Sequence, residues 1–246
     1  MKRFLLPGAV AALLSMPYGA YADTPPPADK GPLQASVEMG LVVTTGNTKT
    51  KNINVKGKVT YAPGESGRWH HSLEASALNA STQGQTTAER YYADGKSTFN
   101  FTKYNYFFGQ VTYDNNRFSG FHYLITEIAG YGRNLIDRPS LTLDLQVGGG
   151  MRQSKIISTG ESQNEPVVQA AGNLQWKISD SSTFTQELST NIGEKRSVSR
   201  SVTSLKTQLV GNLASNISYT AEYTSSVPAG IAKTFTQTSI ALVYSF

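Results

Sequence analysis

The sequence predicts an all-β chain folded as a 12-stranded antiparallel up-and-down transmembrane β-barrel. Three observations lead to this fold class. Apolar and polar residues alternate with a period of two, the period of a β-strand, in twelve segments. The ionisable residues keep almost entirely to one face of these segments. The chain also ends on an aromatic residue, Phe246, directly after an alternating segment.

The N-terminal residues 1–22 are typical of a secretory signal peptide. Lys2 and Arg3 form a basic start, an apolar run follows, and Ala20-Tyr21-Ala22 supplies small residues at a cleavage site. The apolar run is shorter than the about 20 residues of a spanning helix, which argues against an N-terminal membrane anchor. We predict a Pro-rich N-terminal lead over residues 23–32, and, from the features described below, an outer-membrane β-barrel over residues 33–246.

Charge and cysteine content exclude several classes of function. The signal peptide contains two of the 22 basic residues and none of the 17 acidic ones, so the mature chain has a net charge of +3. That excess is too small to predict a nucleic-acid partner. The chain has no cysteine, which excludes disulfides, thiolate metal sites and cysteine nucleophiles. Either a β-barrel or a soluble periplasmic β-protein is compatible with these bounds.

The predicted strands follow one another with turn residues between them, as hairpins require. They span residues 33–44, 49–61, 68–80, 89–101, 104–114, 121–134, 141–153, 166–178, 183–193, 200–213, 217–225 and 234–246. Strands five and six are ambiguous by their apolar residues, and their faces are chosen by Asp114, Glu127 and Arg133.

The predicted connections alternate between short and long. The short ones include residues 102–103 and 214–216, whereas residues 81–90, 154–165 and 226–233 form long polar ones. Outer-membrane barrels have short periplasmic turns and longer external loops. An even number of strands would place both ends of the barrel on the periplasmic side.

The C-terminal segment 234–246 predicts the closing strand of the barrel. Ile240, Leu242, Tyr244 and Phe246 lie on one face of it. This ending resembles the C-terminal signature of Gram-negative outer-membrane proteins, which the barrel-assembly machinery recognises. We therefore expect export to the cell outer membrane, contact with outer-membrane lipid, and recognition of Phe246 by that machinery.

The charged face of the strands predicts the lining of the lumen. Cations and anions are balanced there, eight against eight, whereas a selective pore is usually lined by an excess of one sign. The lining therefore fits either a narrow, weakly selective channel for small solutes or ions, or a filled interior. The predicted lining residues are Lys56, Lys58, Arg90, Lys96, Arg133, Arg152, Lys177 and Lys206, with Glu38, Glu74, Asp94, Asp114, Glu127, Asp144, Glu187 and Glu222.

No catalytic, metal or cofactor site is predicted. The chain has three histidines and no cysteine, without the spacing of a metal site. Gly148-Gly149-Gly150 lies within a predicted strand and indicates close backbone approach rather than a phosphate loop. The one enzymatic alternative is a hydrolase at the rim, with His122 near Asp114, Ser119 and Glu127.

Three stretches resemble the salt-induced outer-membrane protein (YdiY-like) family, a domain of unknown function. They are GLVVTTGNTKT (40–50), DNNRFSGFHY (114–123) with GYG (130–132), and the aromatic C-terminus. The resemblance implies an outer-membrane barrel with a link to salt or osmotic stress, and it carries no catalytic residues. We therefore expect a non-enzymatic, porin-like or structural barrel; the rim hydrolase and the soluble periplasmic β-protein stay as alternatives.

Overall fold

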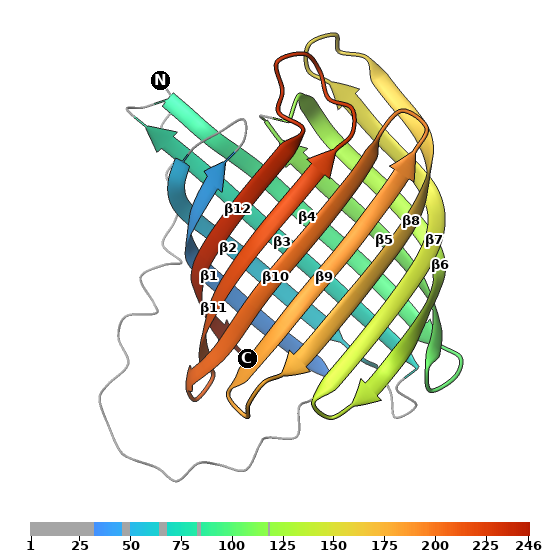
Figure 1. The fold of residues 1–246 in the computed structure, drawn as a ribbon, viewed down its shortest axis with the longest axis vertical. Helices are drawn as coiled ribbons and strands as arrows, with labels where there is room; N and C mark the ends of the chain where they lie inside the picture. Colours follow the sequence, from blue (N-terminus) through green and yellow to red (C-terminus); the bar gives the residue numbers. More distant parts are fainter. Residues whose placement is uncertain (1–31, 46–49, 64–67, 83–84, 118) are drawn as a thin grey trace. The chain divides into compact units, whose positions relative to one another are not determined.

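The first and last strands of the chain pair with each other and close a barrel (Figure 1). In this computed structural model, β1 (Leu33–Thr45) runs antiparallel to β12 (Thr234–Ser245), with Ser36 opposite Ser245 and Leu41 opposite Ile240. The backbone N–H of Phe246 donates a hydrogen bond to the carbonyl of Ala35 at 2.8 Å. The predicted closing role of the C-terminal segment is therefore confirmed.

The structure describes residues 32–45, 50–63, 68–82, 85–117 and 119–246. The predicted signal peptide and, except for Pro32, the Pro-rich lead lie outside the described residues. Within the described part of the chain, no helix is long and apolar enough to cross a membrane.

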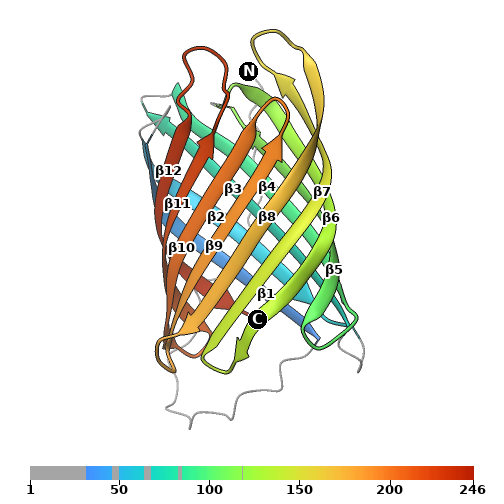
Figure 2. The ribbon, with the colours of Figure 1, turned by 45° about the vertical axis from the view of Figure 1, so that its right-hand side comes forward.

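The described residues form twelve strands, each antiparallel to its neighbours, which confirms the predicted fold class (Figure 2). Most boundaries lie within a few residues of the predicted ones. Between β1 and β12 the strands are β2 (Thr50–Tyr61), β3 (Trp69–Thr82), β4 (Gln85–Asn100), β5 (Asn105–Asn116), β6 (Phe121–Arg138), β7 (Leu141–Ile156), β8 (Ser162–Lys177), β9 (Ser182–Gly193), β10 (Ser197–Val210) and β11 (Leu213–Thr224).

The turn between β10 and β11 differs from the prediction. The sequence predicts this turn at residues 214–216, but those residues belong to β11, where Asn216 pairs with Lys206. The strands instead turn at residues 211–212, and Gly211 has a φ of 50°. Glycine has no Cβ and adopts this left-handed conformation without steric cost, so Gly211-Asn212 is the better hairpin signal.

The predicted long loops are mostly strand. β3 extends to Thr82 and β4 starts at Gln85, within the predicted loop at 81–90. β7 and β8 likewise extend into the predicted connection at 154–165. Polar residues continue these strands because a strand that rises above an apolar band meets water on both faces. The connection at 225–233, between β11 and β12, stays long.

The outer face of the barrel carries large apolar side chains that are about half exposed. Leu73, Val168 and Ile240 are 57%, 56% and 60% exposed, and they come from three different parts of the ring. A protein surrounded by water rarely exposes an apolar surface of this extent.

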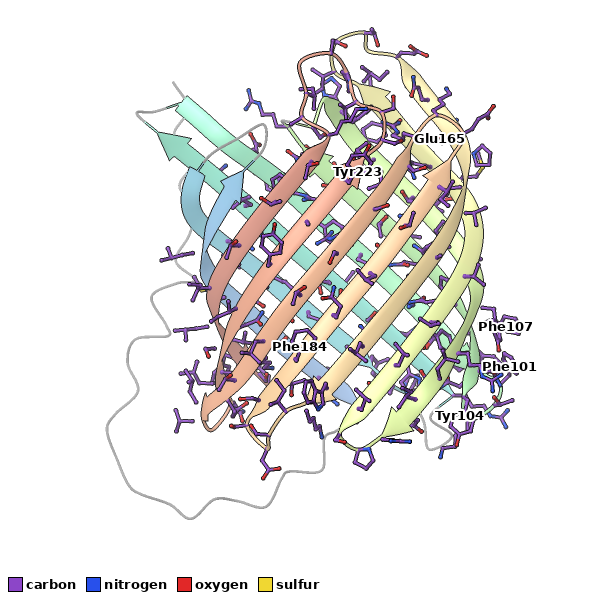
Figure 3. The ribbon with its side chains drawn as sticks, in the orientation of Figure 1. Phe101, Tyr104, Phe107, Glu165, Phe184 and Tyr223 are labelled. Carbon is purple, nitrogen blue, oxygen red and sulfur yellow. The ribbon has the colours of Figure 1, made fainter. Side chains whose placement is uncertain are left out.

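Aromatic rings gather at the end of the barrel where residues 101–104 connect β4 to β5. Figure 3 places Phe101, Tyr104 and Phe107 together near the lower end. The rings of Phe101 and Phe107 lie 4.8 Å apart, and those of Trp69 and Phe99 lie 4.9 Å apart. Amphipathic aromatic rings are typical of the interface between hydrocarbon and water in membrane barrels.

Candidate functional site

The inner face of the barrel holds most of the charged residues predicted to line the lumen, which is the space that the strands enclose. They occupy alternate strand positions, opposite to the exposed apolar residues. The predicted residues on this face are Glu38, Lys56, Lys58, Glu74, Arg90, Asp94, Lys96, Asp114, Asp144, Arg152, Lys177, Glu187, Lys206 and Glu222.

The prediction was wrong for Glu127 and Arg133, which lie on the outer face of β6. Glu127 is paired with Val111 on one side and Met151 on the other. Val111 and Met151 are 51% and 43% exposed, and residues opposite one another in an antiparallel ladder share a face. Arg133 is likewise opposite the exposed Leu145. The charges of Glu127 and Arg133 predicted the wrong face of the strand, because β6 has apolar residues on both of its faces.

An apolar cluster fills part of the lumen and explains why β6 turns apolar residues inward. Tyr106, Phe108, Ile128 and Val167 are all buried together. The Gly148 segment lies close to this cluster, since a Cβ at Gly148 would lie 2.7 Å from Cγ2 of Ile128. Gly148 and Gly150 therefore serve close packing, as the sequence predicts, whereas a Cβ at Gly149 would make only an ordinary contact with the carbonyl of Val167.

Arg90 forms an ion-pair bridge across the lumen. Its guanidinium donates to Asp114 of β5 at 2.9 and 2.6 Å and to Glu222 of β11 at 3.1 Å. Around the ring, β4 and β11 have four strands between them on one side and six on the other. The bridge therefore joins nearly opposite walls, and we call Arg90, Asp114 and Glu222 the cross-lumen bridge.

A second contact crosses the lumen beside this bridge. The guanidinium of Arg200, on β10, lies 5.1 Å from the ring centroid of Tyr92, on β4. These two strands are separated by five strands in either direction. Arg200 was not predicted to line the lumen, because it stands at the first residue of the predicted strand. Following the alternation from Lys206 through Ser204 and Val202 to the start of that strand would have included it.

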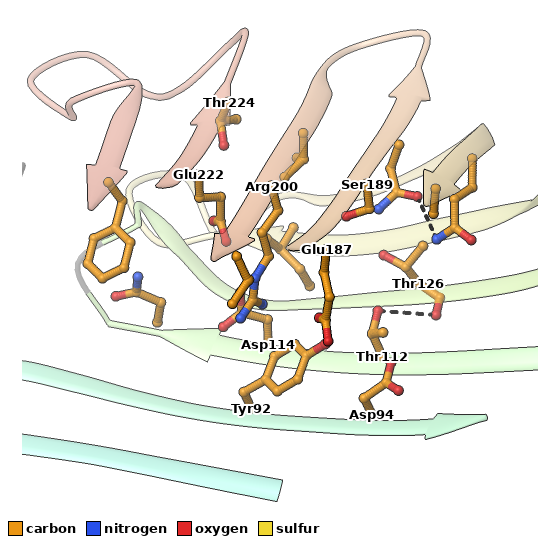
Figure 4. Close-up of a pocket in the computed structure, with 18 of the residues that line it drawn as sticks. Tyr92, Asp94, Thr112, Asp114, Thr126, Glu187, Ser189, Arg200, Glu222 and Thr224 are labelled. Atoms are coloured by element: carbon orange, nitrogen blue, oxygen red, sulfur yellow. Dashed lines mark hydrogen bonds between the residues drawn. The ribbon is translucent and has the colours of Figure 1, made fainter. Parts of the chain in front are cut away.

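The bridge and its neighbours separate two cavities. The larger has a volume of about 430 Å³ and the smaller a volume of about 120 Å³. Arg90, Tyr92, Glu187 and Arg200 line both. Figure 4 shows Tyr92, Asp114, Glu187, Arg200 and Glu222 converging from different strands. The lumen is thus constricted by charged side chains rather than blocked by backbone.

A separate buried cluster lies at the upper end of the barrel, where Figure 3 places Glu165. Glu165 accepts hydrogen bonds from Arg152 Nη1 at 3.2 Å and from Arg196 Nε at 3.3 Å. The backbone N–H groups of Lys195 and Arg196 also donate to it. We call Arg152, Glu165 and Arg196 the rim cluster.

Burial is nearly complete for the rim cluster, with Glu165 1% exposed. It lowers the pKa of the Arg196 guanidinium from its ordinary value, and the hydrogen bond and charge of Glu165 oppose that effect. Arg196 also lies over the ring of Phe121, 4.0 Å from its centroid. Glu165 and Arg196 were missed because the sequence places them in loops.

The residues considered for a rim hydrolase are not brought together. His122 is exposed, whereas the Asp114 carboxylate is inside the lumen and bound to Arg90. Ser119 donates its hydroxyl to the carbonyl of Asn116, and Glu127 is on the outer face. Among the residues that the structure describes, no group of histidines and carboxylates could hold a metal ion.

A closed barrel with an apolar outside and a charged inside defines the class of outer-membrane β-barrels. The fold is similar to the NanC porin, with a TM-score of 0.56, 10% identity, and coverage of 85% of this chain and 98% of that one. It is also similar to an outer-membrane channel from Pseudomonas putida F1, with a TM-score of 0.55, 8% identity, and coverage of 94% and 100%. The translocator domain of the autotransporter NalP from Neisseria meningitidis gives a TM-score of 0.54 at 8% identity, with coverage of 89% and 90%.

Within this class, the chain belongs to the family described as "Protein of unknown function, DUF481", whose model matches residues 37–246. It is similar to the uncharacterized protein YdiY of Escherichia coli K12, with 31% identity over 164 residues. That match covers 67% of this chain and 64% of the relative's own length. The family resemblance stated from the sequence is confirmed.

Proposed function

We propose that this chain is a non-enzymatic channel of the cell outer membrane that passes small polar solutes or ions through a constricted lumen. The observation that carries the proposal is the pair of charge-lined cavities, about 430 and 120 Å³, inside a closed barrel. Polar and ionic linings support passage of hydrated solutes. The side chains of the cross-lumen bridge, rather than the width of the barrel, would then limit conduction.

The exposed apolar residues support a location in a membrane. Leu41, Val168 and Ile240 are each more than half exposed, and a soluble periplasmic protein would carry this surface at a large cost in solubility. Export by the predicted signal peptide belongs to the same proposal. So does recognition of Phe246 by the barrel-assembly machinery, which its 69% exposure would permit.

Planar-bilayer recordings of the refolded chain test the channel. We expect steady unit conductance. A Thr112→Trp variant should reduce it, because Thr112 lines the larger cavity. Val111→Trp is the matched control, since Val111 is the preceding residue on the outer face and is 51% exposed. Absence of conductance in the wild-type chain would favour a structural barrel. Equal effects of both variants would show that the measured current does not pass through this lumen.

A link to salt or osmotic stress rests on the family resemblance alone. If the chain serves the response to such stress, its transcript and protein levels rise after an increase in external osmolarity. Unchanged transcript and protein levels in the native host would count against the link to stress and would not affect the proposed channel.

A further inference from the structure

The smaller cavity contains an unusual set of buried oxygen atoms. Among the described residues, the side-chain oxygens Asn54 Oδ1, Asn216 Oδ1 and Ser239 Oγ are buried without a hydrogen-bond partner. All three residues line the cavity of about 120 Å³. A buried polar atom without a partner costs about 1–3 kcal/mol, so three around one cavity indicate that water or another polar partner occupies it.

The sheet register brings these residues to one wall. Asn54 of β2, Gly40 of β1, Ala241 of β12 and Asn216 of β11 are successive partners across four neighbouring strands. Neither Gly40 nor Ala241 has a polar side chain, and the wall between the two amides is closely packed, since a Cβ at Gly40 would lie 2.5 Å from the Cβ of Ala241. Three strand spacings of about 4.8 Å put the two asparagine backbones roughly 14 Å apart, which is too far for both amides to bind one bare ion directly.

The orientation of the Asn216 amide follows from its contact with Glu38. Asn216 Nδ2 lies 3.2 Å from both carboxylate oxygens of Glu38. An ionised carboxylate only accepts hydrogen bonds, so the NH₂ group of the amide must face it. Oδ1 of Asn216 is therefore the atom that remains for the cavity.

The charge of the wall decides what kind of partner fits. On the wall formed by β11, β12, β1 and β2, Glu38 is the carboxylate, and the other lining oxygens come from neutral amides and hydroxyls. The rest of the cavity is also lined by Glu74, Glu187, Arg90 and Arg200. Arg90 is bound by Asp114 and Glu222. The nearby Lys56 ammonium lies 3.2 Å from Glu74 and is held by that carboxylate. Divalent cations usually recruit several carboxylates, whereas one carboxylate with neutral oxygens suits a single positive charge.

We propose that Glu38, Asn54, Asn216 and Ser239 bind a hydrated monovalent cation, sodium or potassium, in the smaller cavity. The ion keeps part of its water shell, and those waters reach the amide and hydroxyl oxygens that it does not touch. The volume of about 120 Å³ accommodates an ion with several waters. This inference rests on the proposed channel for its role, because the site would favour cations along this wall.

The dependence of the thermal unfolding midpoint on the cation tests the site independently of conductance. The refolded full chain is unfolded by heat in detergent at equal ionic strength, in sodium, potassium or choline chloride. We expect a midpoint about 2–4 °C higher in the sodium or potassium salt, because a ligand that binds only the folded state stabilises it. Choline is too large for the site and acts as the control cation.

Matched variants locate the effect. Asn54→Leu and Glu38→Gln should abolish the difference between sodium and choline, whatever their own midpoints are. Asn173→Leu makes the same amide-to-leucine change on the inner wall at the larger cavity and should keep the difference. If Asn54→Leu does not refold, Glu38→Gln carries the test, with sodium NMR relaxation as a direct measure of binding.

An equal midpoint in choline and sodium, or a difference that survives in both site variants, would overturn the proposal. Its failure and that of the channel can be told apart. A sodium-specific increment in a barrel that carries no current would retain the site and refute the channel. Conduction without the sodium-specific increment would retain the channel and refute the site.

Discussion

Two buried arginine–carboxylate clusters in this barrel have opposite compositions and join different parts of the wall. The cross-lumen bridge holds one arginine between two carboxylates, and the rim cluster holds one carboxylate between two arginines. The bridge joins nearly opposite walls, β4 and β11. The rim cluster joins the neighbouring strands β7 and β8 to residues 194–196, which connect β9 to β10.

This difference separates a group that shapes the lumen from a group that holds the wall. Glu165 binds two backbone N–H groups as well as two guanidinium groups, so its carboxylate fixes the path of the chain between β9 and β10. The partners of Arg90 are the side chains of Asp114 and Glu222. The backbone pairing of β4 with β5 and of β11 with β12 does not depend on the Arg90 side chain. Losing the rim cluster should therefore cost stability, and losing the bridge should change passage.

The largest effect is expected for Glu165→Ala. It leaves two buried guanidinium groups without a carboxylate, and breaking such a buried pair costs about 3–5 kcal/mol. The free energy of unfolding, measured by urea titration with tryptophan fluorescence in detergent, should fall by about this amount. Glu161→Ala is the control, because Glu161 is exposed in the neighbouring connection. Equal stabilities of the two variants would remove the structural role of the rim cluster.

Arg90→Gln should lower stability by less than Glu165→Ala and should increase the selectivity of the lumen for cations. The carboxylates of Asp114 and Glu222 would face the hydrated lumen, so we expect a loss of about 1–2 kcal/mol. Removing the bridge should raise unit conductance several-fold. The two uncompensated carboxylates should also raise the permeability ratio of potassium to chloride, measured from reversal potentials in a salt gradient. A conductance equal to that of the wild type would show that the bridge does not limit passage.

The clusters also mark how far the sequence predicts this molecule. Period-two alternation suffices for the strands and for the inner position of Arg90 and Glu222, because alternation is a local property, whereas the inner position of Asp114 is predicted from its charge. Their partnership is not local: Arg90 and Glu222 are 132 residues apart, and they meet only because the closed ring has this number of strands.

The errors have local causes. Glu165 follows the alternation of β8 through Gln163, Val167 and Gln169, but Pro166 interrupts the pattern and coincides with the predicted boundary. Glu127 was placed inside on its charge, although the opposing Val111 and Met151 are exposed outward. The face of one strand is thus better judged from its neighbours than from a single ionisable residue.

Glu127→Leu contrasts a charge on the outer face with a charge inside the lumen. An ionised side chain on the lipid face of a barrel is destabilising, and less so for a carboxylate than for the 2–4 kcal/mol of a mid-membrane lysine or arginine. We expect a stability gain of about 1 kcal/mol for the barrel folded in lipid vesicles. Glu187→Leu is the control, since Glu187 lines both cavities and should show no gain. A loss of stability in Glu127→Leu would indicate a polar partner on that outer face.

The smallest effect is expected for a third arginine–carboxylate pair, which lies at the surface. Arg117 Nη1 is 3.1 Å from Glu89 Oε2, a distance equal to that between Arg90 and Glu222, but the Arg117 side chain is 63% exposed. Exposed pairs contribute about 0.2–1 kcal/mol because water and salt screen them. The backbone N–H of Arg117 also donates to the carbonyl of Glu89, and that bond persists in Arg117→Ala.

We therefore expect Arg117→Ala to lower the free energy of unfolding by less than about 1 kcal/mol, with a difference that vanishes at high salt. Conductance should stay at the wild-type value. A loss as large as that of Glu165→Ala would mean that pair geometry, and not burial, sets the strength of these contacts. The distinction between the bridge, the rim cluster and the surface pair depends on burial, since their shortest nitrogen–oxygen distances differ by less than 1 Å.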